Sequence, residues 1–287
     1  MRDVTTPDGR TLRLHEAGAA DGPLVLVQQG TPMSGLLYEP HAIDATHRGI
    51  RLVAYDRPGY GGSTSAPGRS VADAASDVAA IADALEADRL ALWGVSGGGP
   101  HALACAALLP ERIVAVASLA SVAPFEAAGL DWLAGMGETN VHEFGAAQAG
   151  QDALEEYLGK EETQTVTPGG LIEGMRSLLS DVDAAVLTGE VGEYLAANMN
   201  DATREGTDGW RDDDLAFVKP WGFALEDIRV PVQLWHGRQD RFVPFAHGEW
   251  LAARVSGVDA RLSSEDGHLT LMQRRVPAVH EWLLERF

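Results

Sequence analysis

Short apolar runs alternate along the chain with stretches in which apolar residues recur at helical spacing. The clearest runs lie at residues 24–27, 51–55, 90–95 and 113–119. A strand that is buried on both faces reads as such a run, whereas an amphipathic helix repeats its apolar residues every three or four positions. Helical spacing follows two of the runs, over 71–87 and 98–109. The alternation predicts βαβ units, and therefore a mostly parallel central sheet flanked by helices.

The start of the chain follows a different pattern. Residues 4–6 and 11–17 flank the sequence Pro7-Asp8-Gly9-Arg10, and Leu12 and Leu14 occupy alternate positions in the second stretch. Alternation is typical of a half-buried strand, and Pro, Asp and Gly favour tight turns. An antiparallel hairpin is therefore expected here.

The pattern changes between residues 123 and 222, where no clear buried run is found. Short helical stretches, such as 153–158 and 171–179, are separated there by glycine-rich turns. The elements expected after this segment are strands at 230–235 and 260–262 and helices at 245–255 and 269–287. We therefore predict an α/β core made of residues 1–122 and 223–287, interrupted after the sixth strand by a helical cap made of residues 123–222.

The charge of the chain is strongly negative. With 42 acidic and 22 basic residues, the formal net charge is −20. Such a surface repels nucleic acid and anionic membranes, so neither is expected as a partner. Acidic residues gather between 123 and 222, for instance in Asp212-Asp213-Asp214. Because charge runs usually form a solvated face, we expect these aspartates at the surface.

The single cysteine, Cys105, rules out an intramolecular disulfide and a metal site built from several cysteines. It lies in the apolar run 102–109, which favours a buried structural thiol. The polar start Met1-Arg2-Asp3-Val4 does not resemble a signal peptide. No segment approaches the roughly 18 uninterrupted apolar residues of a membrane span. These features predict a cytoplasmic protein.

Five residues, Gly94-Val95-Ser96-Gly97-Gly98, stand between a predicted buried strand and a predicted helix. The pattern G-x-S-x-G alone is weak, because small residues recur by chance in a chain with 32 glycines. In this setting, however, the glycines permit a sharp turn that raises the serine hydroxyl above the sheet. The start of the following helix also favours developing negative charge. Ser96 is therefore the candidate nucleophile.

A serine hydroxyl needs a base to become an effective nucleophile, and histidine is the usual one. On a strand-turn-helix elbow the order along the chain is serine, then acid, then histidine. His268 fits this order, because it follows the strand expected at 260–262, at the sheet edge where α/β active sites form. His236 shares its turn with an aspartate that is better placed as the acid, and His247 and His280 fall in helices where solvated positions are expected.

Two aspartates compete for the role of the acid that orients His268. Asp240 follows the strand end at Trp235 by five residues, which places it at the carboxyl edge of the sheet. Asp266 lies only two residues before His268 and is the alternative. The strand-end position favours Asp240, whose other reading is a turn formed with the nearby backbone.

Several segments share a signature that goes beyond single motifs. They are GVSGGGP at 94–100, DRPGYGGS at 56–63, HGRQDRFVP at 236–244 and Gly267-His268. Together they resemble the α/β-hydrolase superfamily, and the likeness spans the core on both sides of the interruption. The resemblance implies the α/β-hydrolase fold with a cap after the sixth strand, an acyl-enzyme mechanism, and a substrate pocket between cap and core.

One loop departs from the family pattern. After the first buried strand the family usually has His-Gly-x-Pro, whereas this chain has Gln29-Gly30-Thr31-Pro32. By position, the resemblance assigns the oxyanion hole to the backbone N–H groups of Thr31 and Gly97, and a backbone donor does not depend on a neighbouring histidine. We expect the Gln29 amide to supply the hydrogen bonds that hold the loop.

These observations predict a serine hydrolase that cleaves a small carboxylic ester, lactone, thioester or amide with the triad Ser96, His268 and Asp240. A small-molecule acyl substrate is the expected partner. No cofactor or metal is expected, because no G-x-G-x-x-G follows the first strand and no His or Cys cluster has ligand spacing. An acyltransferase, lyase or perhydrolase with the same triad is the alternative within the fold, and a ligand-binding protein without turnover is the alternative outside it. Ser96 argues against the dehalogenase and epoxide-hydrolase branches, which have aspartate at that position.

Overall fold

Eight strands form one central sheet in the computed structural model, which describes residues 1–161, 165–187 and 189–287. The strands are β1 (Arg2–Thr5), β2 (Thr11–Gly18), β3 (Leu24–Gln28), β4 (Arg51–Tyr55), β5 (Leu90–Val95), β6 (Ile113–Leu119), β7 (Val232–Gly237) and β8 (Asp259–Ser263). Their order across the sheet is β1-β2-β4-β3-β5-β6-β7-β8. β2 pairs antiparallel with both β1 and β4, and the pairs from β4 to β8 are parallel. Both the hairpin and the mostly parallel sheet are therefore confirmed.

The middle strands are apolar on both faces. β3, β5 and β6 are buried along their whole length. In the parallel register, Leu26 of β3 lies beside Val53 of β4 on one side and Leu92 of β5 on the other. Removing such runs from water supplies the main driving force for folding, about 25 cal/mol per Å² of apolar surface, and it fixes the centre of the sheet.

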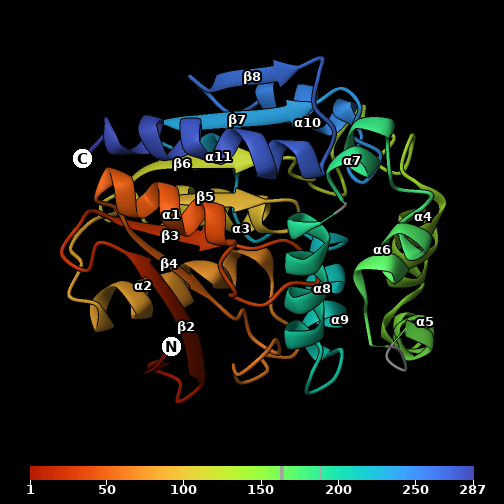
Figure 1. Cartoon of the computed structure of the whole chain (residues 1–287), viewed down its shortest axis with the longest axis horizontal. Coiled ribbons are helices and arrows are strands. Elements are labelled where there is room, and N and C mark those ends of the chain that lie inside the picture. The colour runs from red at the N-terminus through yellow and green to blue at the C-terminus, as the bar shows by residue number, and fades with distance from the viewer. Residues whose placement is uncertain (162–164, 188) are drawn as a thin grey trace.

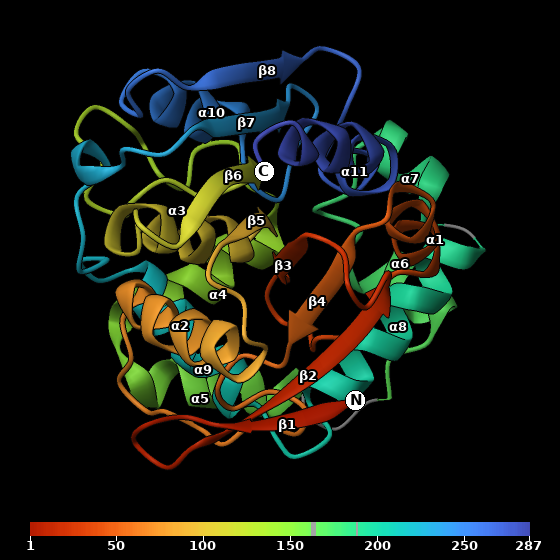
Figure 2. The same cartoon turned by 90° about the vertical axis from the view of Figure 1, so that its left-hand side faces the viewer.

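Helices cover both faces of the sheet, as Figure 2 shows. α1 (Glu39–Arg48) and α11 (Leu269–Leu284) pack on one face, and α2 (Ala74–Ala84), α3 (Gly98–Leu108) and α10 (Phe245–Ala252) pack on the other. The short 3-10 helices are η1 (Val71–Asp73) and η2 (Leu225–Asp227). A separate hydrophobic cluster fills the space between the sheet and each helical layer.

α1 is a helix that the apolar pattern did not predict. Its sequence EPHAIDATHR is mainly polar, and only His41 and Ala45 are buried. Gly49 ends it in the left-handed conformation, with φ 70°, as is common for a helix C-terminus. The helix is therefore stabilised by its end signals and by packing on α11 rather than by a clear apolar face.

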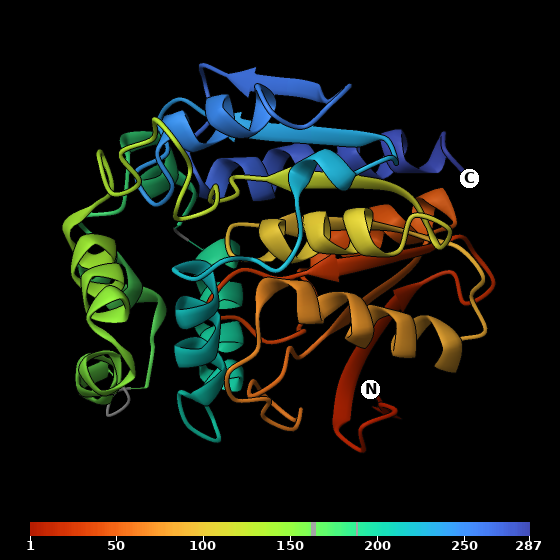
Figure 3. The same ribbon diagram turned by 180° about the vertical axis from the view of Figure 1, so that it is seen from behind.

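Between β6 and β7 the chain leaves the sheet, and we call residues 123–222 the insertion. Its described helices are α4 (Glu138–Ala149), α5 (Gln151–Glu161), α6 (Pro168–Gly174), α7 (Asp181–Val186), α8 (Glu190–Ala202) and α9 (Asp208–Phe217). Figures 1 and 3 show these helices gathered at the end of the sheet where the parallel strands have their carboxyl ends. α5 and α6 overlap the helical stretches predicted from the sequence, whereas the other four were not predicted.

The expectation that Asp212, Asp213 and Asp214 lie on a solvated face is wrong. All three belong to α9 and are at most 2% exposed. Asp213 accepts hydrogen bonds from Arg57 (2.5 Å) and Arg69 (2.7 Å), which lie in the loop after β4. Burial acts to raise the pKa of Asp213, but the two guanidinium groups outweigh it and hold the pKa far below its usual range. The acidic run is a buried ionic junction between the insertion and the core.

Two histidines that were expected in solvated positions are also buried. His247 of α10 and His280 of α11 are both 0% exposed. The His247 ring accepts a hydrogen bond from the N–H of Ala123 (3.0 Å) and bonds the carbonyl of Trp132 (2.8 Å), and His280 Nδ1 lies 2.8 Å from Asp44. The helix faces that carry them point toward neighbouring segments of the protein, a direction that helical position alone does not reveal.

The interior of α3 holds the single cysteine. Cys105 is free and fully buried, which confirms the predicted structural thiol, and burial raises the pKa of this thiol well above its usual range. Across the described residues, no helix combines the length and the apolar character needed to cross a membrane.

Candidate active site

Ser96 lies in a strained turn between β5 and α3. Its φ is 54°, in the left-handed region that residues with a side chain rarely adopt. The turn brings backbones very close together: a Cβ at Gly94 would lie 2.3 Å from the carbonyl oxygen of Gly98, and one at Gly98 would lie 2.0 Å from that of Gln28. Only glycine fits at these two positions, so the glycines of the motif permit the sharp elbow that exposes the Ser96 side chain.

Asp240 and His268 are brought together from two loops at the carboxyl edge of the sheet. Asp240 Oδ2 lies 2.8 Å from His268 Nδ1, and Oδ1 accepts the backbone N–H groups of Phe242 (2.9 Å) and Val243 (2.8 Å). Because a carboxylate only accepts, the proton of the neutral imidazole is assigned to Nδ1, and Nε2 keeps its lone pair. The ring of Phe242 stacks on that of His268, with centroids 4.5 Å apart. Orientation and tautomer of the imidazole are thus both fixed.

The surroundings of His268 favour its protonated form. Burial lowers the pKa of the imidazole, but the charge and the hydrogen bond of Asp240, together with the charge of Asp183, outweigh burial. The net result is a pKa above the usual value for histidine. A pair of this kind stabilises an imidazolium when the ring takes up a proton.

The alternative residues have other partners. Asp266 is buried and its Oδ2 accepts a hydrogen bond from Arg275 Nε (2.8 Å), and it makes no recorded hydrogen bond to His268 within the described part of the chain. His236 is buried with Nε2 2.8 Å from the carbonyl oxygen of Val243, and burial lowers its pKa. Of the candidates from the sequence, the structure therefore joins Asp240 to His268.

Ser96 borders two hollows that share part of their wall. The larger has a volume of about 320 Å³ and lies between the core and the insertion, where Phe144, Leu171, Trp210 and Phe217 contribute to its wall. The smaller, about 70 Å³, is lined by both Ser96 and His268. The candidate nucleophile and the candidate base therefore face the same space.

The oxyanion loop borders both hollows. The N–H groups of Thr31 and Gly97 have no recorded acceptor among the described residues, as a site for a developing anion requires. Arg57 donates to the carbonyl of Gly30 (2.9 Å), and Thr31 Oγ1 donates to Asp213 (2.7 Å). These contacts hold the loop and leave its N–H groups available.

Gln29 occupies the position where histidine was expected from the family pattern. Its side-chain Nε2 donates to the carbonyl oxygen of Leu36 (2.9 Å), and the backbone carbonyl oxygen of Gln29 accepts a hydrogen bond from Arg57. The Gln29 amide therefore ties the two ends of the loop together, which is the contact proposed for it from the sequence.

Two acidic side chains of the insertion border the larger hollow. Glu143 of α4 and Asp214 of α9 border it, and Trp210 Nε1 donates to Glu143 Oε1 (2.8 Å). Burial and the adjacent Glu143 carboxyl raise the pKa of Asp214 well above its usual range. Asp214 therefore keeps its proton to a higher pH than an ordinary aspartate does. No Lys, Arg or His is among the described residues that line this hollow.

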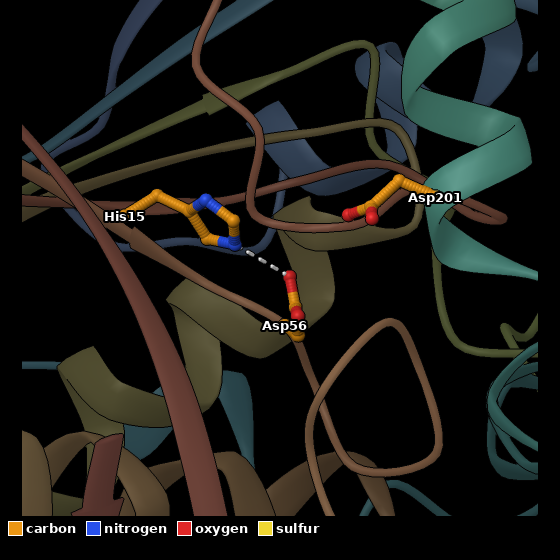
Figure 4. A group of neighbouring side chains, drawn as sticks. All are labelled: His15, Asp56 and Asp201. Carbon is orange, nitrogen blue, oxygen red and sulfur yellow. Dashed lines mark hydrogen bonds and ion pairs between the residues drawn. The ribbon is translucent and has the colours of Figure 1, made fainter. Parts of the chain in front are cut away.

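Figure 4 shows a group of three side chains of the types that bind metals. None of the three is among the described residues that line the two hollows. Within the described residues, His15, Asp56 and Asp201 place one ligand atom each within 4.8 Å of the others. The carboxylate of Asp56 already accepts the N–H groups of Gly35 (2.6 Å) and Gly62 (2.7 Å), and it lies 2.9 Å from His15. These donors occupy the Asp56 oxygens. We therefore interpret the group as a set of hydrogen bonds that hold the loop after β4 in place.

Several residues at the site were not found from the sequence. Phe242 follows Asp240 in the same loop, so an aromatic residue beside the predicted acid was an available signal. Asp183, Glu143 and Asp214 belong to the insertion. No local pattern indicates that Asp183 bonds the backbone of His268 or that Glu143 and Asp214 border the larger hollow. Their positions depend on how the insertion folds over the sheet.

Comparison with known proteins places these features in context. A family model described as alpha/beta hydrolase fold matches residues 23–274. A bifunctional esterase/perhydrolase of Acinetobacter calcoaceticus is 28% identical over 249 residues, which cover 85% of this chain and 84% of that protein. A non-heme chloroperoxidase of Streptomyces lividans is 28% identical over 271 residues, covering 93% and 92%. Among solved structures, a thermophilic esterase from Thermogutta terrifontis has a TM-score of 0.71 at 20% identity, covering 99% of this chain and 98% of that one, which shows a common fold.

Proposed function

The chain belongs to the α/β hydrolase fold family, and from this premise we propose that it is a serine hydrolase of small carboxylic esters or of related lactones, thioesters or amides. One observation carries the proposal. Ser96, in its strained elbow, and His268, paired with the buried Asp240, border the same hollow. The helices of the insertion then act as a cap over the core, and a small acyl compound is the partner.

In the proposed reaction, His268 is the general base. Its Nδ1–H donates to Asp240, so Nε2 takes the proton of Ser96 as Oγ attacks the acyl carbon. The bond from the acyl carbon to the leaving oxygen breaks, and the imidazolium returns the proton to that oxygen. Water, deprotonated by the same imidazole, then attacks the acyl-enzyme and releases the acid together with free Ser96.

The tetrahedral intermediates carry a negative oxygen that needs donors already in place. We assign this task to the N–H groups of Thr31 and Gly97, which border the hollow beside Ser96. A single donor of this kind contributes about 10²–10³-fold to kcat. The contacts of Arg57 and Asp213 with the loop keep such donors fixed before the substrate arrives.

The wall of the larger hollow favours an uncharged and mainly apolar substrate group. Much of its surface is formed by apolar side chains such as Phe144, Leu171 and Phe217, and the ionisable residues in its described lining, Glu143 and Asp214, are acidic. An anionic group would lose its hydration there and gain no basic partner among the described lining residues. We therefore expect neutral acyl esters to be preferred over esters that carry a free carboxylate.

Acyl transfer to hydrogen peroxide is the second candidate function. The relative from Acinetobacter calcoaceticus is named as both an esterase and a perhydrolase. Both reactions pass through the same acyl-enzyme, and they differ in whether water or peroxide attacks it. Measuring acid and peracid formed from one ester over a range of peroxide concentrations separates the two.

The direct test is Ser96→Ala, assayed on a series of p-nitrophenyl esters of rising chain length that includes the p-nitrophenyl hemiester of succinic acid. We expect kcat to fall by about 10⁴ or more, because the nucleophile is lost while the other groups remain. The wild type should turn over the neutral esters faster than the hemisuccinate. An unchanged thermal unfolding curve shows that the variant is folded, and near-normal turnover by a folded variant would refute the role of Ser96.

A further inference from the structure

One carboxylate of the insertion is bonded to the segment that carries the candidate base. Asp183 of α7 is 0% exposed. It accepts the backbone N–H groups of His268 (2.9 Å), Leu269 (2.9 Å) and Thr270 (3.1 Å). Figures 1 and 2 both show α7 beside α11, at the end where α11 begins. Three successive backbone donors therefore converge on one side chain that is about 85 residues away in the sequence.

These bonds replace a cap that α11 lacks. The first N–H groups of a helix have no partner within it, and the side chain of the preceding residue usually accepts one of them. Here the preceding residue is His268, which makes no such bond because its ring is bonded to Asp240. The His268 side chain is bonded to Asp240 and therefore cannot also cap α11. The carboxylate of Asp183 accepts the N–H groups at the start of the helix instead.

The contact is built closely on both sides. A Cβ at Gly267 would lie 2.2 Å from Asp183 Oδ2, so this position requires glycine for the carboxylate to approach. Ser180, the residue before α7, donates its Oγ–H to Asp183 Oδ2 (2.9 Å) and holds the carboxylate from the same segment of the insertion. The backbone on each side of the His268 side chain is thereby fixed to the insertion.

We propose that Asp183 is a positioning residue for His268. By bonding the backbone N–H groups at and after His268, Asp183 sets the position of the catalytic imidazole, so the reaction depends on how α7 packs against the start of α11. The inference rests on the proposed function, in which His268 is the base. Asp183 touches neither substrate nor the reacting atoms, so it acts only through His268.

The charge of Asp183 acts on the pKa of His268, and this effect can be measured separately from any effect on the structure. The titratable groups that act on His268 are Asp240, Asp183 and, from β7, His236. Asp183 contributes to raising the pKa of His268. Loss of its charge should lower that pKa, and the acid limb of the kcat/KM profile should move to lower pH.

The test compares Asp183→Asn with Asp181→Asn, a matched change at an exposed position of the same helix. Asparagine keeps the shape, but it has one acceptor oxygen and would turn an N–H donor toward backbone donors. We expect Asp183→Asn to lower kcat by about 10²-fold with little change in KM, because small misplacement of a catalytic group has that effect. Its acid limb should move to lower pH, and Asp181→Asn should resemble the wild type in both respects.

A second measurement does not depend on turnover. Titration of the His268 ring by NMR, assigned by comparison with His268→Ala, should give a lower pKa in Asp183→Asn than in the wild type. If Asp183→Asn does not fold, Ser180→Ala weakens the same contact while keeping the carboxylate, and a smaller loss of kcat is expected. A folded Asp183→Asn protein with wild-type kcat and an unmoved His268 titration would overturn the inference. If Ser96→Ala keeps activity while the His268 titration moves as expected, the proposed function fails and the Asp183 contact stands.

Discussion

At the scale of single residues, the site depends on a backbone conformation that is costly for a residue with a side chain. A left-handed φ such as that of Ser96 costs about 1–3 kcal/mol and persists only where neighbouring contacts hold it. The Ser96 N–H donates to the carbonyl of Leu119 (2.9 Å), and the N–H of Gly99 donates to the carbonyl of Ser96 (2.9 Å). The strand beside the elbow and the helix after it thus hold the strained turn, and the hydroxyl stays at the cavity without a rearrangement.

The acid of the triad can be tested by a pair of changes. Asp240→Asn removes the charge that stabilises the imidazolium and favours the wrong tautomer, so we expect kcat to fall by up to about 10⁴-fold. Asp266→Asn should leave kcat within a few fold, because that carboxylate is bonded to Arg275 rather than to His268. Both variants are assayed on one ester, with thermal unfolding recorded because Asp266 is buried. A crippling Asp266→Asn change beside a mild Asp240→Asn change would require a different triad.

At the scale of helices and strands, prediction succeeded where a buried element has a recognisable pattern of apolar residues in its own sequence. β5 and β6 are read directly from uninterrupted apolar runs, because strands buried on both faces leave no polar position. α9 is different, since its sequence DGWRDDDLAF reads as solvated although most of it is buried. Its Asp213 is paired with Arg57 and Arg69 from another part of the chain. Such pairing is created by tertiary contact, so no local pattern indicates it.

The carboxyls facing each other between α4 and α9 give a prediction about stability. Burial and Glu143 raise the pKa of Asp214 well above its usual range in the folded protein, whereas in the unfolded chain this carboxyl ionises above about pH 4. The folded state therefore holds a proton that the unfolded state releases, and the free energy of unfolding falls as pH rises above 4. Asp214→Asn keeps a neutral group of similar shape that can donate to Glu143. We expect it to raise the free energy of unfolding at pH 7 by about 1 kcal/mol or more.

The measurement is urea unfolding of the Asp214→Asn protein and the wild type at pH 5 and pH 7.5. The gain should be larger at the higher pH. Asp208→Asn is the control, because Asp208 lies on the same helix in an exposed ion pair with Arg211 (2.7 Å), a kind of contact that contributes about 0–1 kcal/mol. Equal destabilisation of Asp214→Asn at both pH values would mean that Asp214 is ionised in the folded protein.

At the scale of the whole molecule, the position of the site follows from the parallel sheet. Parallel strands carry their carboxyl ends to one edge, so the loops that bear Thr31, Ser96, Asp240 and His268 meet there although they are far apart in the chain. That rule made these residues predictable as candidates. Asp183 was not predictable, because it arrives from the insertion, and the packing of the insertion on the sheet obeys no comparable rule.

The pH dependence of overall stability should be governed by buried neutral histidines. Burial lowers the pKa of His41 to about 3 and those of His101 and His247 to about 4, whereas an unfolded histidine titrates near 6.5. Between pH 6.5 and 4 these histidines become protonated in the unfolded chain but stay neutral in the folded protein. Each of these histidines therefore removes up to about 1.4 kcal/mol of stability per pH unit as the pH falls. The pKa of His268 is raised in the folded protein. Its contribution to the free energy of unfolding is therefore fully present below pH 6.5 and does not alter the slope in this range.

We therefore expect the free energy of unfolding, measured with urea from pH 7 to pH 4.5, to fall steeply below pH 6.5. These three histidines contribute up to about 4 kcal/mol per pH unit, or about three protons. His236 and His280 act in the same direction, because burial lowers the pKa of each. His247→Asn should make the slope shallower by about one proton, since its neutral side chain does not titrate. His142→Asn is the control, because the side chain of His142 is 64% exposed. A flat profile between pH 6.5 and 5 in the wild type would show that the buried rings are already protonated in the folded protein. That result would contradict the placement of two of the rings, because His101 Nδ1 lies 2.8 Å from the carbonyl oxygen of Gly97 and His41 Nε2 lies 2.9 Å from that of Met272. Asp213 Oδ1 lies 3.7 Å from His101 Nε2, but burial outweighs the charge of this carboxylate and keeps the pKa of His101 low.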